Sequence, residues 1–165
     1  MPILGEIVSV KYTKPFAMGI YSGNQKPTIV NIFLKAFVEE YNEIGREGIQ
    51  LNNENVSLSL NAVICDAPAK AFISGVKYHS GYFGCSKCTI EGDFIDNRVV
   101  FLDTHCRLRT DTSFRLRLQD EHHKSKSILE DTKIGMVSQL PLDYMHLICL
   151  GVSIASFFCI QDQLL

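Results

Sequence analysis

The feature that most constrains the fold is a short apolar run that ends in an acid. Ala62–Cys65 is apolar throughout and is followed by Asp66 and then by Pro68. In α/β folds, ligand-binding groups stand at the carboxyl ends of buried strands. Proline suits the first turn of a helix, where its missing N–H costs nothing. The sequence therefore predicts a long strand over 56–65, Asp66 at its tip and a short helix over 69–76.

Asp66 has two interpretations. A carboxylate at a buried strand end is costly unless a metal ion, a helix N-terminus or hydrogen bonds receive it. The functional interpretation is that Asp66 binds a divalent ion. The ordinary alternative is that Asp66 only caps the helix that begins near Pro68, and the residues alone leave both open.

A paired cysteine motif follows on a glycine-flanked loop, at Cys85 and Cys88. Two thiolates separated by two residues reach adjacent corners of a tetrahedral Zn²⁺ site. A redox pair is the rival interpretation, but the loop has no long helix directly after it to lower a thiol pKa. A pair without any ligand is the third alternative. Zinc is the cofactor that this spacing favours.

A closed zinc site needs further ligands, and no second paired motif supplies them. The remaining candidates are His105, Cys106, His122, His123 and His146. Asp143 and His146 are three residues apart on a helix predicted to begin near Pro141, so they share one face. That pair suits metal ligation or a hydrogen bond that orients the imidazole. The ordinary alternative is an acid near a helix start and a histidine at the edge of the core.

The pattern of apolar and polar residues divides the rest of the chain into predicted elements. Residues 2–10 and 16–23 predict a hairpin, and apolar residues at three- and four-residue steps predict a helix from 28 to a glycine at 45 or 48. We expect one α/β domain with three parts: a core over 1–92 that includes the CxxC loop, a charged irregular insertion over 93–140, and a C-terminal helix over 141–165. A chain of 165 residues with 46% hydrophobic content can bury one core of this size.

Net charge and cysteine content restrict the kinds of function that the chain can have. The formal net charge is −2, so nothing global indicates nucleic-acid binding. Arginines at 107, 109, 115 and 117 are nearly balanced by nearby acids, which favours a solvated charged face over a phosphate grip. The six scattered cysteines indicate reduced thiols of an intracellular protein. The apolar run over 147–160 is interrupted and too short to span a bilayer, so no membrane association is expected.

Four segments, taken in this order, resemble the catalytic core of DDE-type cut-and-paste DNA transposases, in particular those of CACTA-like elements and of transposase-domain proteins of animal genomes. The segments are Cys65–Ala69, Gly81–Cys88, Phe101–Phe114 with its Leu108–Asp111, and Leu142–Leu147. The likeness extends from about Pro2 to Val152, which is nearly the whole chain.

The resemblance implies a partial RNase H-like fold, a mixed sheet with flanking helices, carrying a largely irregular insertion with the CxxC. It also implies that Asp66 is the second of three catalytic acids, which together hold two Mg²⁺ for DNA strand cleavage and transfer. The family's CxxC falls on Cys85 and Cys88, and its Asp-x-x-His element falls on Asp143 and His146.

The sequence departs from the family at both ends. The first acid is expected ahead of Pro2 and the last well downstream of His146, so Asp66 has no partners within residues 1–165. Two hard cations need several oxygen ligands each, and Mg²⁺ is expected only with all three acids present. Possible substitutes are Glu6, Asp93, Asp96 and Asp103, none of which lies at an expected sheet end.

We therefore expect a catalytically inactive fragment or domesticated remnant of a transposase. One alternative is a non-catalytic, zinc-containing module that binds DNA or protein. Another is an active transposase or nuclease whose missing acids come from further sequence. The expected partners are DNA, bound weakly, and other proteins, with no small-molecule substrate. The resemblance implies a nuclear location.

Overall fold

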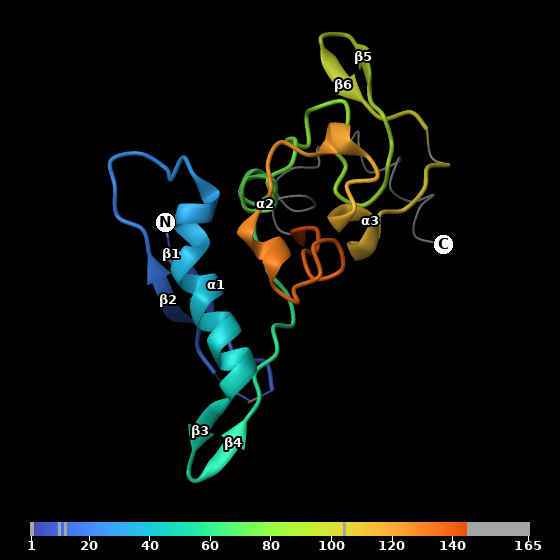
Figure 1. The fold of residues 1–165 in the computed structure, drawn as a ribbon. Helices are drawn as coiled ribbons and strands as arrows, with labels where there is room; N and C mark the ends of the chain where they lie inside the picture. The colour runs from blue at the N-terminus through green and yellow to red at the C-terminus, as the bar shows by residue number, and fades with distance from the viewer. Residues whose placement is uncertain (1, 10, 12, 104, 145–165) are drawn as a thin grey trace. The chain divides into compact units, whose positions relative to one another are not determined.

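The computed structural model describes residues 2–9, 11, 13–103 and 105–144, which belong to two compact units (Figure 1). Unit 1 comprises residues 1–59 and 127–132, and unit 2 comprises residues 60–126 and 133–165. Each unit is described by itself. The sequence-based division at residues 92 and 140 stays a prediction.

Unit 1 begins with an antiparallel hairpin of β1 (Pro2–Gly5) and β2 (Phe16–Ile20). Pro2 lies opposite Ile20 and Gly5 lies opposite Phe16, with an irregularity between Ile3 and Leu4. β-Branched and apolar residues favour such strands. The predicted hairpin is confirmed, although both strands are shorter than the sequence suggested.

The long helix of unit 1 is α1 (Val30–Glu47), and it confirms the predicted helix. It ends at Gly48, which has a φ of 75° and donates its N–H to the carbonyl of Ile44 at 2.8 Å. Glycine adopts this left-handed region without the steric cost of a side chain. Its buried face is Val30, Leu34 and Val38, spaced one turn apart.

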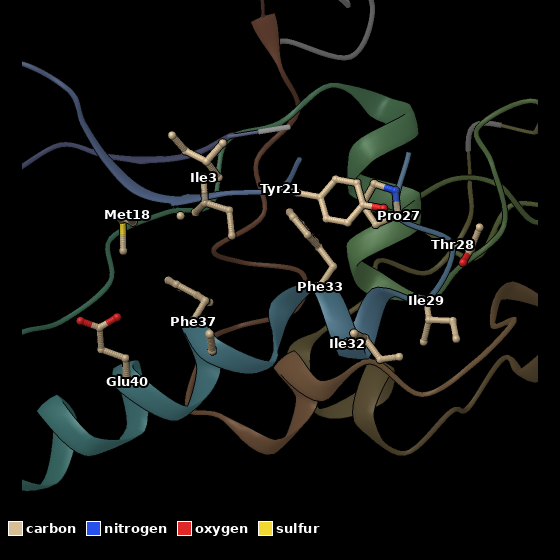
Figure 2. A pocket seen from close by; sticks show the side chains of 13 residues that line it. Ile3, Met18, Tyr21, Pro27, Thr28, Ile29, Ile32, Phe33, Phe37 and Glu40 are labelled. Atoms are coloured by element: carbon tan, nitrogen blue, oxygen red, sulfur yellow. The ribbon is translucent and has the colours of Figure 1, made fainter. Parts of the chain in front are cut away.

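The short 3₁₀ helix η2 (Ile128–Asp131) covers part of α1 although it lies far along the chain. Its Leu129 is only 1% exposed, and the Ile128 N–H donates to the Asn31 side-chain oxygen at 2.9 Å. A second face of α1 lines an apolar groove of about 410 Å³ against the β1–β2 hairpin. Figure 2 shows Phe33 and Phe37 on α1 directed toward Ile3 of β1.

Two further hairpins have two-residue turns. β3 (Ile49–Leu51) pairs with β4 (Glu54–Val56) in unit 1, and β5 (Asp93–Ile95) pairs with β6 (Arg98–Val100) in unit 2. In each hairpin both turn residues have a positive φ. The values are 49° at Asn52 and 67° at Asn53 in the first turn, and 48° at Asp96 and 62° at Asn97 in the second. Asparagine and aspartate tolerate this conformation best after glycine. The sequence predicts a turn over 93–98 and a short strand over 99–102, which β6 overlaps, so the correction is that residues 93–95 form the strand β5.

The long strand predicted over 56–65 is wrong. Regular structure ends at Val56, and residues 57–66 form neither strand nor helix. The segment is held instead by single contacts, such as the Val63 N–H that donates to Gln139 O at 2.8 Å. Ile64 is 74% exposed, so the apolar run is not buried as a central strand would be.

Unit 2 contains α2 (Ala67–Ser74), α3 (Asp111–Arg115) and the 3₁₀ helix η1 (Asp120–His122). Thr110 caps α3, with the Thr110 hydroxyl accepting the Ser113 N–H and the Ser113 hydroxyl accepting the Thr110 N–H. The buried apolar residues of this unit are Ala71, Ile73, Val76, Ile90, Phe114, Ile134, Met136, Val137 and Leu140. They come from both helices and from loops, so loops supply much of the core.

The fold is a mixture of helices and small antiparallel sheets, which confirms the α/β class. In the part of the chain that the structure describes, the strands form three separate two-stranded sheets. They do not confirm the single mixed sheet of an RNase H-like fold, because residues 57–66 do not pair as a strand. The helix predicted over 141–165 lies, beyond residue 144, outside the described residues. No helix among those described is long and apolar enough to cross a membrane.

Candidate functional site

Asp66 is the N-cap of α2. Its carboxylate accepts the Ala69 N–H at 2.7 Å, and its backbone carbonyl accepts the Lys70 N–H at 2.8 Å. Pro68 lies in the first helical turn, as predicted. The expected strand-tip position is wrong because residues 57–65, directly before Asp66, form no strand, and the ordinary capping role is the one that the geometry shows.

Replacing Asp66 with alanine is expected to lower the free energy of unfolding by about 1 kcal/mol, the usual value of an N-cap. Asp66→Asn keeps an oxygen that accepts the Ala69 N–H and should stay close to the wild type. Urea denaturation of the two variants checks this. Equal losses in both would show that the carboxylate charge, rather than the cap, stabilises this region.

Asp143 and Lys70 both interact electrostatically with Cys65, the residue directly before Asp66. Burial raises the pKa of the Cys65 thiol to about 11; the charge of Lys70 opposes this rise, and the carboxylates of Asp66 and Asp143 add to it. Both acids therefore lie near enough to Cys65 to affect its titration. Lys70 is 6% exposed and donates to the carbonyl of Pro141. The Lys70 ammonium interacts electrostatically with Asp143 and so offsets part of the negative charge that two Mg²⁺ ions require.

The CxxC forms a tight turn with its two thiols together. The Sγ atoms of Cys85 and Cys88 are 3.4 Å apart, and the N–H groups of Lys87 and Cys88 both point at Cys85 Sγ at 3.4 Å. Two thiolates on one tetrahedral Zn²⁺ stand about 3.8 Å apart, given Zn–S bonds of about 2.3 Å. The thiol separation thus differs from that of a zinc pair by only a few tenths of an ångström.

The turn depends on glycine at its start. Gly84 donates its N–H to Gly81 O at 2.9 Å, and a Cβ atom at position 84 would overlap the backbone oxygen of Tyr78. A residue without a side chain is therefore required for the close approach of these two backbone segments. These backbone contacts shape the loop that leads into Cys85.

A third thiol reaches the pair from a distant segment. The Thr89 N–H donates to Arg107 O at 2.9 Å and the Arg109 N–H donates to Lys87 O at 2.8 Å, so residues 87–89 and 107–109 pair like two strands. This pairing brings the Cys106 thiol to the Cys88 thiol. The sequence offered Cys106 only as one donor among several. The β5–β6 hairpin between the two segments is what returns the chain, and its turn was the available signal.

The thiol of Cys88 is protonated in the absence of a metal. Burial raises the pKa of Cys88 to about 12, and the neighbouring thiols of Cys85 and Cys106 add to this rise. An attacking redox thiol needs a lowered pKa, so Cys88 does not favour the redox alternative. Metal binding at Cys88 has to displace this proton.

Arg109 brings a buried positive charge to the thiols. It is 7% exposed, its Nε donates to Cys85 O at 3.1 Å, and its Nη2 donates to the side chain of Gln119. Gln119 in turn donates to Thr89 O at 3.0 Å. Burial lowers the pKa of Arg109, and the charges of Cys85 and Cys88 oppose this. The guanidinium therefore lies buried beside the backbone of the CxxC.

The arginines of the charged segment act within unit 2. Besides Arg109, Arg115 donates to Ile134 O at 2.7 Å and Arg117 donates to Ser125 O at 3.3 Å. The expected solvated charged face is wrong for Arg109, which is buried. A guanidinium engaged with backbone carbonyls is poorly placed to hold phosphates as well.

The two adjacent histidines lie in the core of unit 2. His122 is fully buried, and its Nδ1 is 2.6 Å from Phe83 O, so this nitrogen carries the proton and donates. The ring of Phe114 meets both imidazoles edge-on, with its centroid 4.6 Å from that of His123. His122 Nε2 and His123 Nδ1 have no hydrogen-bond partner within the described structure. Burial lowers the pKa of each histidine to about 4.

Two lysines hold the segment that leads to Asp143. Lys87 donates to Val137 O at 2.6 Å and to Leu140 O at 3.1 Å, while Lys70 donates to Pro141 O. Asp111 of α3 contacts the same segment: its carboxylate accepts the Val137 N–H at 2.7 Å and the Ser138 hydroxyl at 2.6 Å. Burial alone would raise the pKa of Asp111, but these hydrogen bonds lower it overall.

The structure brings some predicted site residues together and not others. Cys85 and Cys88 are paired, and Asp66 and Asp143 share the surroundings of Cys65. Over residues 2–144, gaps excepted, no three His, Cys, Asp or Glu side chains are already arranged as ligands of one metal ion. His146 lies outside the described residues. Comparison of the chain with known protein families, with curated proteins and with solved structures gives no match.

Proposed function

We propose that the chain is a transposase-derived domain without catalytic activity whose unit 2 is a zinc-containing binding module. The observation that carries the zinc part is the CxxC turn, with its thiols 3.4 Å apart and two N–H groups directed at Cys85 Sγ. The order of the four transposase-like segments supports descent from an RNase H-like catalytic core. A nuclear, intracellular location follows from that descent.

The proposed lack of catalysis rests on the surroundings of Asp66. One of its oxygens is used by the Ala69 N–H, and the Lys70 ammonium interacts electrostatically with Asp143, the other acid near Cys65. The side chains suggested as substitute acids are exposed and lie in other contexts: Glu6, Asp93, Asp96 and Asp103. A two-metal mechanism needs several oxygens directed at one point.

Zinc bound by Cys85 and Cys88 would supply a cross-link that fixes the turn at the edge of unit 2. Because thiolates bind the ion, binding free energy adds to the free energy of folding of this small core. The proposed role is structural, which requires that further side chains fill the remaining positions of the tetrahedral site.

A protein partner is favoured over DNA. Three arginines of the charged segment are engaged with backbone carbonyls, and the net charge is −2. Large apolar side chains are exposed on and beside β5 and β6, namely Phe94, Ile95, Phe101, Leu102 and Leu108. Exposed apolar groups near one another are typical of protein interfaces, whereas DNA-binding surfaces are strongly basic.

Purified protein is expected to contain about one zinc ion per chain, and Cys85→Ser should lose both the metal and part of the thermal stability. Cys65→Ser is the matched control, since Cys65 is a half-buried thiol that is not part of the pair. Metal analysis and thermal melting measure both effects. A stable, metal-free wild type would contradict the proposed zinc module.

Catalysis is tested separately with Asp66→Asn. The wild type should not cleave DNA in Mg²⁺ or Mn²⁺, and a gel-shift assay should show at most weak, salt-sensitive binding. Because asparagine preserves the helix cap, any cleavage by the wild type that Asp66→Asn abolishes would identify the carboxylate as catalytic. That result would overturn the proposed lack of activity.

A further inference from the structure

We infer that Cys106 is the third thiolate of the metal centre, so that unit 2 binds a soft divalent cation through three cysteines. This inference rests on the proposed zinc module and identifies its missing ligand. Cys106 belongs to no sequence motif, and in the chain the β5–β6 hairpin separates it from the CxxC.

The backbone pairing places Cys106 at the pair. Two hydrogen bonds, from Thr89 to Arg107 and from Arg109 to Lys87, fix the register of the two segments, with Cys88 opposite Leu108. Cys106 lies two residues before Leu108, so in this extended stretch its side chain is on the same face as those of Leu108 and Cys88. In agreement with this placement, the Cys106 thiol adds to the raised pKa of Cys88. Its other contact is weak, at 3.9 Å from Sγ to Asp103 O. A small movement of this thiol would complete a three-sulfur arrangement, which the side chains do not yet form by themselves.

The local charge favours three thiolates over two. A divalent ion with two thiolates is neutral, whereas three thiolates leave one negative charge. Arg109 is 7% exposed, and its Nε donates to Cys85 O at 3.1 Å, so a buried guanidinium lies beside the pair. A buried guanidinium beside a neutral centre would be costly, and beside an anionic one it is compensated.

Histidines are the rival third ligands. His122 Nε2 and His123 Nδ1 have no hydrogen-bond partner among the described residues. Their rings, however, pack against Phe114, and His122 is tied to Phe83 O by its other nitrogen. The test therefore includes the variants His122→Asn and His123→Gln.

Co²⁺ titration of the full chain counts the thiolates, because the sulfur-to-cobalt charge-transfer band grows with each bound sulfur. Cys106→Ser should lose about one third of the band and bind zinc roughly 100-fold more weakly, at the upper end of losses seen when support of a ligand is removed. Cys65→Ser should retain the full charge-transfer band and the zinc affinity of the wild type. Proton release on zinc binding gives a second count, about three per ion in the wild type and about two in Cys106→Ser.

The outcomes separate this inference from the proposed function. Metal binding that is unchanged in Cys106→Ser would overturn the third-thiolate assignment while leaving the zinc module intact. Loss of binding in His122→Asn or His123→Gln, with Cys106→Ser unaffected, would assign the third position to histidine. A wild type that binds neither Co²⁺ nor Zn²⁺ would overturn the proposed zinc module itself. Circular dichroism of each variant verifies that it is folded.

Discussion

Phe114→Ala is expected to lower the free energy of unfolding of unit 2 by about 3 to 5 kcal/mol, as for other aromatic side chains removed from a packed core. Phe114 is 3% exposed, and its ring lies against both His122 and His123. Its removal would leave a cavity beside two imidazole rings whose free nitrogens water could then reach. Amide hydrogen exchange of α2 and α3 measures the loss within this unit.

Leu116→Ala is the matched control for this substitution. Leu116 is the C-cap residue of α3, two positions after Phe114, and is 65% exposed. Substitution of an exposed side chain changes stability by about 0.5 kcal/mol or less. Similar effects of the two substitutions would mean that α3 does not pack through Phe114 as described.

The stability of unit 2 is expected to fall as the pH is lowered from about 6.5 to 4. Burial, as the main cause, lowers the pKa of His122 in the folded chain to about 4, against an ordinary value of 6.5. Between these values the unfolded chain binds a proton that the folded chain does not, so stability decreases by about 1.4 kcal/mol per pH unit. The contribution is fully present above pH 6.5 and amounts to about 3 kcal/mol for this fully buried residue.

Urea denaturation at a series of pH values tests this dependence. His122→Asn should flatten the fall between pH 6.5 and 4, because asparagine does not titrate. His79→Gln should leave it unchanged, since His79 is exposed. His123, whose pKa burial also lowers to about 4, would account for a residual slope in His122→Asn. A wild type with equal stability at pH 4 and pH 7 would contradict the burial of neutral histidines.

Local features of the fold could be predicted from the sequence. α1 follows from apolar residues at helical spacing and ends at Gly48, and Pro68 marks the start of α2. The CxxC turn is also local, because two residues between thiols set their separation. In each case the determining interactions lie within a few residues of one another.

Features that depend on distant segments could not be predicted. The apolar run over 62–65 has the composition of a buried strand, but residues near 139 supply its contacts and Ile64 stays exposed. Cys106 reaches Cys88 only because a hairpin intervenes. His122 was a candidate ligand by residue type, and its position is set by Phe83 and Phe114. Spacing alone does not encode such contacts, since tertiary packing overrides local preference.

The lysine contacts of unit 2 have a consequence for covalent modification. Lys70 and Lys87 hold residues 137–141 by donating to backbone oxygens, and no regular secondary structure fixes this stretch. Acetylation of either amine would remove its charge and most of its donor capacity, and would release the polypeptide that leads into Asp143. Because Lys70 is almost fully covered, its rate of acetylation would report how often this segment opens.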